Sequence, residues 1–364
     1  MTTHASENDR RSRGPNRRTP LLLAAGLACL LAIAGASGAA PRDIASSSAA
    51  ALGRAIVSEP LQRPSIRVSP PASPGPSASA TAAVATPAAA APAAETPDSR
   101  PTRPAARARS AAAGAPVDGK GMWIWHYGRI AGGNHETIVR HAENLGLTHI
   151  YVRVGSGYSG LDTLAQVAPV IPVAHRAGIK VIAWYFPYYN DIQADVRRSV
   201  EAMSTQVRGE SFDGFAADIE PAKGADFSAE TAAAYSRALR AALPDRYLIA
   251  VPMRPTKSTI ASGIFDAIMP HYDAVAPMTY WGRFDPAETV RYTIEYLSRY
   301  GKPVSPVGQT YDMGPEGGPR GNPPPHQTWA FMKAAGAAGA VGVSFWSWQH
   351  ATSPEFDAIR KYRW

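Results

Sequence analysis

A short segment of the chain ends in two closely spaced carboxylates. The run from Asp213 to Glu220 reads DGFAADIE, with the alternation of a β-strand, in which successive side chains point to opposite faces. Asp218 and Glu220 therefore share one face, with Cα atoms roughly 6.6 Å apart at about 3.3 Å per residue. Two carboxylates this close do not ionise independently, so we expect one of them to have a raised pKa. A carboxyl group that stays protonated near neutral pH can act as a general acid.

The same alternation places the small residues Gly214 and Ala216 on the carboxylate face and the large apolar residues on the other. The large residues are expected to pack under helices, whereas the small ones leave room on the carboxylate face. A purely structural role is the alternative: Asp218 would be a hydrogen-bonding group of the core, and Glu220 would begin a helix.

The elements that position this pair follow a repeating order from residue 118 onward. Eight short apolar runs are expected to be strands, at 122–125, 149–154, 180–186, 214–219, 248–253, 274–279, 304–308 and 341–346. Amphipathic segments alternate with them at 134–145, 162–177, 191–207, 228–242, 257–268, 285–299, 326–337 and 353–361. Eight βα units in about 245 residues predict an α/β fold, a (β/α)₈ TIM barrel, whose chemistry lies at the C-terminal ends of the strands.

The strand with the carboxylates resembles that of family 18 glycoside hydrolases, the chitinases and their relatives. These enzymes are (β/α)₈ barrels with the fourth-strand motif D-G-x-D-x-D-x-E. The chain matches this motif at Asp213, Gly214, Asp218 and Glu220, and it departs at Ala216, where the family has its middle Asp.

Two later segments carry the resemblance further. Met278-Thr279-Tyr280 is similar to the family's M-x-Y-D after the sixth strand, with Trp281 in place of the Asp, and the segment 342–348 ends the eighth strand with tryptophans. The resemblance implies that Glu220 protonates the leaving oxygen. Asp218 would orient the substrate's acetamido group, which acts as the nucleophile, and Tyr280 would hold that group. A mechanism with two protein carboxylates stays open, and Asp312 is the best-placed second acid.

Aromatic residues are concentrated on or beside the expected strands, which hold six of the eight tryptophans. Sugar rings stack their apolar faces on flat aromatic surfaces and need polar partners for their hydroxyls. We therefore predict substrate binding by aromatic and polar residues at the strand ends, namely Trp125, Arg153, Tyr185, Arg254, Trp281, Gln309, Trp346 and Trp348. Core packing is the alternative, and it is favoured for Trp123 and Trp184.

Neither a metal nor an organic cofactor is expected. His126 and His350 follow strands that adjoin in a closed barrel, but the chain has no H-x-H or H-E-x-x-H spacing. No glycine-rich loop has the form of a phosphate cradle. Residues 118–364 carry 24 Lys and Arg against 23 Asp and Glu, so the basic balance belongs to the first 117 residues, with 13 against 6. A nucleic-acid partner is therefore not expected, and the barrel is expected to be a monomer.

The sequence of the N-terminal third of the chain predicts that the protein is exported from the cytoplasm. Five arginines between Arg10 and Arg18 precede an uncharged run at 21–40 that ends in small residues, which is the order of a signal peptide. The run is also long enough to span a bilayer once, so residues 1–40 are either a cleaved signal or a membrane anchor. Residues 41–117, rich in Ala, Pro and Ser, are expected to be a disordered linker. The only cysteine, Cys29, lies in the apolar run.

These features together predict an exported glycoside hydrolase that acts on an extracytoplasmic polysaccharide, with N-acetylhexosamine units as in chitin or peptidoglycan one option for the sugar. The alternative is a catalytically silent carbohydrate-binding barrel that keeps Asp218 and Glu220 as binding groups. The long Gly- and Pro-rich loop at 310–325 is expected to overhang the mouth.

Overall fold

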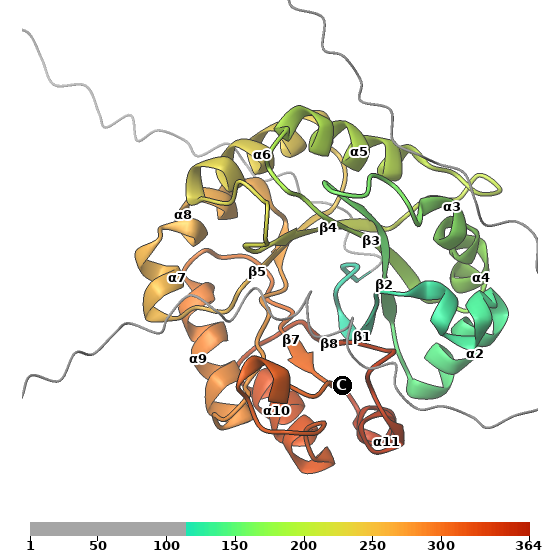
Figure 1. Cartoon of the computed structure of the whole chain (residues 1–364). Helices are drawn as coiled ribbons and strands as arrows, with labels where there is room; N and C mark the ends of the chain where they lie inside the picture. The colour runs from blue at the N-terminus through green and yellow to red at the C-terminus, as the bar shows by residue number, and fades with distance from the viewer. Residues whose placement is uncertain (1–113) are drawn as a thin grey trace, which may run out of the picture. The chain divides into compact units, whose positions relative to one another are not determined.

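A computed structural model describes residues 114–364, and the predicted signal or anchor at 1–40 and nearly all of the predicted linker lie outside the described residues. The strands form one parallel sheet in the order β6-β5-β4-β3-β2-β1-β8-β7. Parallel bridges from Val275 to Val304 and from Met278 to Val307 join the two ends of the sheet. The predicted (β/α)₈ barrel is therefore confirmed (Figure 1). The strands are β1 (Gly119–Ile124), β2 (His149–Ser156), β3 (Lys180–Phe186), β4 (Gly214–Ile219), β5 (Leu248–Pro252), β6 (Ala274–Val275), β7 (Val307–Gln309) and β8 (Gly342–Trp346).

Helices surround the strands, as Figure 1 shows. They are α2 (His135–Leu145), α3 (Leu164–Val167), α4 (Ile171–Arg176), α5 (Ile192–Ser204), α6 (Ala229–Ala242), α7 (Lys257–Ala261), α8 (Ile264–Ile268), α9 (Pro286–Ser298), α10 (Pro325–Ala337) and α11 (Ser353–Lys361). Two predicted helices are broken. The segment 162–177 is divided by a 3-10 turn that contains Pro169, which has no N–H to donate to a helical ladder. The segment 257–268 is divided at Gly263, whose φ is 72°.

Strand alternation divides the core into an interior cluster and an outer cluster. On β4, Phe215 and Ile219 belong to the outer cluster with residues of the surrounding helices, whereas Ala216 belongs to the interior cluster. Ala216 is in register with Trp184 of β3, which also lies in the interior. The predicted alternation is thus confirmed, and a bulky indole lies beside the position where the resembled family has an aspartate.

The first residue of the DGFAADIE segment has a structural role. Asp213 precedes β4, at the end of the strand opposite to the carboxylate pair, and its Oδ2 accepts hydrogen bonds from the backbone N–H of Val181, at 2.7 Å, and from His175 Nε2, at 2.9 Å. His175 Nδ1 contacts Glu210 on its other side. Burial lowers the pKa of His175, but the hydrogen bonds and charges of Asp213 and Glu210 outweigh burial, so that the pKa is raised. The imidazole of His175, which is charged below its raised pKa, therefore ties the end of α4 to the entry of β4.

This arrangement predicts a pH-dependent contribution to stability. Because the pKa of His175 is higher in the folded state, the contribution is fully present below the ordinary pKa of His, near 6.5, and is lost as the pH rises through the raised value. We expect His175→Gln to lower the free energy of unfolding by about 1 kcal/mol at acidic pH, because the contacts are partly exposed, and by less at alkaline pH. Urea unfolding of both proteins across the pH range checks this, and a difference that grows with pH would contradict it.

Candidate active site

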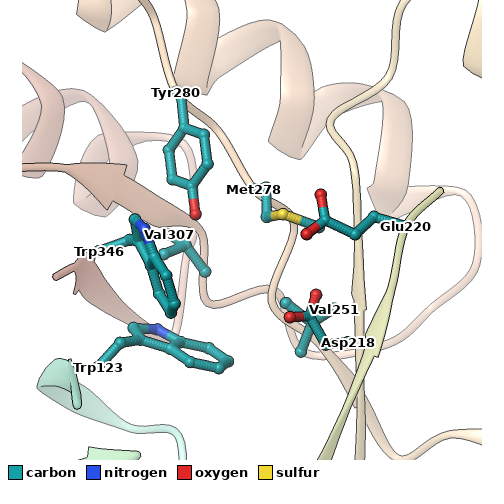
Figure 2. A pocket seen from close by; sticks show the side chains of 8 residues that line it. All are labelled: Trp123, Asp218, Glu220, Val251, Met278, Tyr280, Val307 and Trp346. Atoms are coloured by element: carbon teal, nitrogen blue, oxygen red, sulfur yellow. The ribbon is translucent and has the colours of Figure 1, made fainter. Parts of the chain in front are cut away.

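The two carboxylates of β4 meet at the C-terminal mouth of the barrel. Asp218 is 8% exposed, and its Oδ1 has no hydrogen-bond partner among residues 114–364. Glu220 follows directly after the strand and is partly exposed to the same space. Figure 2 shows both carboxyl groups on one side of a pocket, facing Trp123 and Trp346 on the other. Asp218 and Glu220 therefore point to the same side of the strand, as the sequence predicts.

The surroundings of Asp218 and Glu220 raise the pKa of both carboxyl groups. Burial raises the pKa of Asp218. Burial also raises the pKa of Glu220, and the negative charges of Asp218 and Glu316 raise it further. The two groups titrate as a unit, since ionisation of one disfavours ionisation of the other. Such a pair can keep one transferable proton near neutral pH, as a general acid requires.

The inner part of the cavity is small, about 40 Å³. Its walls are apolar or aromatic apart from the carboxylates and one phenol, and come from Trp123, Val251, Met278, Tyr280, Val307 and Trp346. The Tyr280 hydroxyl is directed toward the centre of this space (Figure 2). The ring of Tyr280 lies edge-on to Tyr311, with centroids 5.5 Å apart. The inner pocket is therefore narrow and mostly apolar, with the two carboxyl groups and the Tyr280 phenol as its polar groups.

The outer part of the cavity is larger, about 290 Å³, and is built mainly by residues of β2 and β3 and by the segments that follow β1, β2 and β3. It shares Asp218, Glu220 and Trp346 with the inner part. Its remaining walls combine aromatic and hydrogen-bonding side chains, from Trp125, His126, Arg153, Ser156, Tyr158, Ser159, Asp162, Trp184, Phe186 and Tyr188. The carboxylates thus lie at the junction of two connected pockets, and their setting is typical of a small-molecule site.

The structure adds a third carboxylate that the sequence did not predict. Glu316 belongs to the long loop after β7, where its Oε2 accepts a hydrogen bond from the Tyr311 hydroxyl at 3.1 Å. Tyr311 in turn packs against Tyr280 of the inner pocket, and the charge of Glu316 acts on Glu220. Asp312, the second acid considered from the sequence, is exposed and accepts a hydrogen bond from the Gly314 N–H at 2.7 Å. Asp312 therefore shapes the loop.

The structure brings together the predicted catalytic residues Asp218, Glu220 and Tyr280 and the predicted binding residues Trp125, Arg153 and Trp346. It does not bring five others to the cavity, namely Tyr185, Arg254, Trp281, Gln309 and Trp348. Trp123 and Trp184, for which core packing was favoured, lie in the interior cluster and also line the cavity.

The strand period explains why Tyr185 does not line the cavity. Trp184 and Phe186 face the interior, so Tyr185 between them faces the helices, where its hydroxyl donates to Asp195 Oδ1 at 2.7 Å. Trp348 also lies in the outer cluster, 5.2 Å from the ring of His141.

The remaining three residues support loops. Trp281 donates to Gln327 Oε1 at 2.9 Å and packs on Phe331 of α10. Gln309 accepts from the Gly282 N–H at 2.9 Å and so holds the turn after Trp281. The guanidinium of Arg254 lies 5.3 Å from the centre of the Phe284 ring.

Other site types were sought in the described part of the chain. Residues 114–364 contain no group of three or more His, Cys, Asp and Glu residues that could hold a metal ion. Within the same range, no helix has both the length and the apolarity to cross a membrane.

Comparisons with known proteins agree with the barrel. No family model matches the chain, and no curated protein matches it. Among solved structures, it is similar to an endo-β-1,4-mannanase from Thermotoga petrophila, with a TM-score of 0.51 and 12% identity over 68% of this chain and 77% of that one. It is also similar to a class V chitinase from Pseudomonas fluorescens Pf-5, with a TM-score of 0.50 and 12% identity over 67% and 99%. The chain therefore shares its (β/α)₈ fold with solved glycoside hydrolases.

Proposed function

We propose that the protein is a glycoside hydrolase that cleaves an extracytoplasmic polysaccharide, with Glu220 as the general acid and Asp218 as its partner. The observation that carries this proposal is the carboxyl pair, with Asp218 buried and Glu220 partly exposed, at the junction of two aromatic-lined pockets. Glycosidic cleavage needs a proton donor at the leaving oxygen and a carboxylate or equivalent group for the positive charge at the anomeric carbon. The similar mannanase and chitinase folds are compatible with this chemistry.

In the proposed reaction, Glu220 gives its proton to the glycosidic oxygen while the bond from that oxygen to the anomeric carbon breaks. Asp218 lies beneath, with one carboxylate oxygen that is not hydrogen-bonded within residues 114–364. The small inner pocket, with the Tyr280 hydroxyl directed into it, suits a polar substituent such as an acetamido group. An N-acetylhexosamine at the cleavage position is therefore the favoured substrate. Its acetamido oxygen would attack the anomeric carbon, and Asp218 would orient that group.

Export belongs to the same proposal. The basic residues, the uncharged run and the Pro-rich segment of the first 117 residues support delivery of the barrel across the cytoplasmic membrane, as a secreted protein or one anchored by residues 1–40.

A catalytically silent carbohydrate-binding barrel is the second candidate. One observation favours it: Ala216 removes a carboxylate that the resembled family has next to the pair, and Trp184 lies beside that position. A binding barrel would keep the aromatic cavity without needing proton transfer.

Turnover of defined polymers separates the two candidates. We expect the purified protein to release new reducing ends from oligomers of N-acetylglucosamine and not from mannan oligomers, which lack the acetamido group. Calorimetric titration of the same oligomers measures binding in parallel. Binding of the oligomers without any cleavage across the polymer panel would show a binding barrel and defeat the enzyme proposal.

A further inference from the structure

The polar side of the outer pocket is built around a matched pair of opposite charges. Arg153, from β2, has its Nη1 3.1 Å from both carboxylate oxygens of Asp162. Its Nη2 donates to Ser159 Oγ at 2.9 Å, and Ser159 is held in turn by Ser156. The side chain of Arg153 is only 13% exposed and that of Asp162 39%. The pair therefore presents guanidinium donors and carboxylate acceptors at one edge of the cavity, with little net charge.

The remaining charges at this cavity do not favour an anion. Asp218 and Glu220 lie at its inner end. His126 also lines it, and burial lowers the pKa of His126, with the charges of Arg129, Arg153 and His350 lowering it further, so this imidazole is neutral near pH 7. Arg153 is thus the one permanent cation among the residues that line the described outer pocket, and Asp162 neutralises it.

Aromatic rings also line the outer pocket, among them the exposed Tyr158. Trp125 is stacked on His126, with centroids 4.1 Å apart. Tyr188 lines the pocket, and the ring of Tyr158 lies 5.9 Å from it at an interplanar angle of 32°. Tyr158 is 82% exposed, so much of its ring is accessible to a ligand in the pocket that it lines. Aromatic rings are thus available both near the carboxylates, from Trp125 and Trp346, and at the exposed Tyr158.

We propose that the outer pocket is a subsite for an uncharged sugar, that the Arg153–Asp162 pair selects it against acidic sugars, and that the next sugar of the chain stacks on Tyr158. Sugar hydroxyls and amides both donate and accept hydrogen bonds, so they match a guanidinium and a carboxylate side by side. For an acidic sugar, the one cation that lines the pocket, Arg153, is already paired with Asp162, whose carboxylate would repel the charge of the sugar. The position of the cleaved bond rests on the proposed function, but sugar binding itself does not.

The selectivity is tested by binding in the Glu220→Gln background, in which turnover is expected to be about 10²–10⁴-fold slower. The probes are a tetramer of N-acetylglucosamine and a peptide-free tetramer of alternating N-acetylglucosamine and N-acetylmuramic acid, which adds carboxylates to an otherwise similar chain. We expect the neutral tetramer to bind at least tenfold more tightly. Adding Asp162→Asn should weaken the neutral tetramer a fewfold and tighten the acidic one about tenfold, because Arg153 is freed to pair with its carboxylate.

Two further variants make the test specific. Asp357→Asn breaks an Arg–Asp pair of the same kind on α11, where Arg360 and Asp357 are half exposed, and should change neither affinity. Tyr158→Ala, at a largely exposed position, should weaken the tetramers by about fivefold, the loss expected for one stacked ring, and leave a dimer of N-acetylglucosamine unaffected.

Equal binding of both probes by the parent protein, no gain for the acidic tetramer in Asp162→Asn, or no binding of either probe would overturn the subsite. If the expected binding pattern holds while the protein without the Glu220 change cleaves neither probe, the subsite stands and the proposed hydrolysis fails.

Discussion

Replacing Glu220 by Gln is expected to lower kcat on an N-acetylglucosamine oligomer by about 10²–10⁴-fold and to leave its Kd nearly unchanged. Glutamine keeps the shape of the side chain and most of its hydrogen bonds but has no transferable proton. The general acid contributes in the transition state, when the leaving oxygen takes up a proton, and little in the bound ground state. Steady-state kinetics beside calorimetric titration measures the two quantities separately.

Glu288→Gln is the matched control for this variant. Glu288 lies in the first turn of α9, outside the residues that line the cavity, so the same chemical change there should leave kcat as it is. An equal loss of kcat in both variants, or a loss of affinity as large as the loss of kcat in Glu220→Gln, would contradict a role in proton transfer.

Replacing Asp218 by Asn is the second large effect, with an expected loss in kcat of about 10²-fold, because it removes the carboxylate proposed to orient the acetamido group and the charge that acts on Glu220. The variant should also shift the pH dependence of activity in a direction that can be stated in advance. Glu220 must be protonated, so activity is lost as the pH rises through its pKa, which Asp218 raises. The basic limb of the kcat/KM profile should therefore move to lower pH in Asp218→Asn.

Glu316→Gln provides a graded comparison. The charge of Glu316 also raises the pKa of Glu220, after burial and Asp218 in size, so this variant should move the basic limb in the same direction by a smaller amount. A basic limb that stays in place in both variants, or moves to higher pH, would show that Glu220 is not the group whose protonation limits the rate.

The sequence predicts the barrel because its local patterns agree with one another. Glycine at 178 and 301 adopts a positive φ just before the third and seventh strands, as expected of helix ends. Ser228 and Thr231 form the predicted cap of α6. The DGFAADIE segment also fixes which face each β4 side chain takes, so the carboxylate pair follows from a period of two.

The predicted binding residues that do not line the cavity owe their positions to identifiable causes. Tyr185 was predicted from its residue type, although strand alternation already placed it opposite to Trp184 and Phe186. Trp281 and Trp348 follow the ends of their strands, where the period no longer applies and loop geometry decides the direction of the side chain. The approach of Glu316 to the carboxylate pair depends on the path of the loop at 310–325, which no periodicity encodes. Tyr158 and Asp162 also lie in a loop, so no periodicity predicts where their side chains lie.

The dependence of the rate on the leaving group tests the central claim most directly, because proton donation matters only when the leaving oxygen is basic. Two N-acetylglucosaminides would be compared in the parent protein and in Glu220→Gln, one with a sugar as the leaving group and one with dinitrophenolate, which departs without a proton. If Glu220 is the general acid, the variant should be about 10²–10⁴-fold slower on the sugar leaving group and close to the parent protein on the dinitrophenyl glycoside. An equal loss on both substrates would contradict the account.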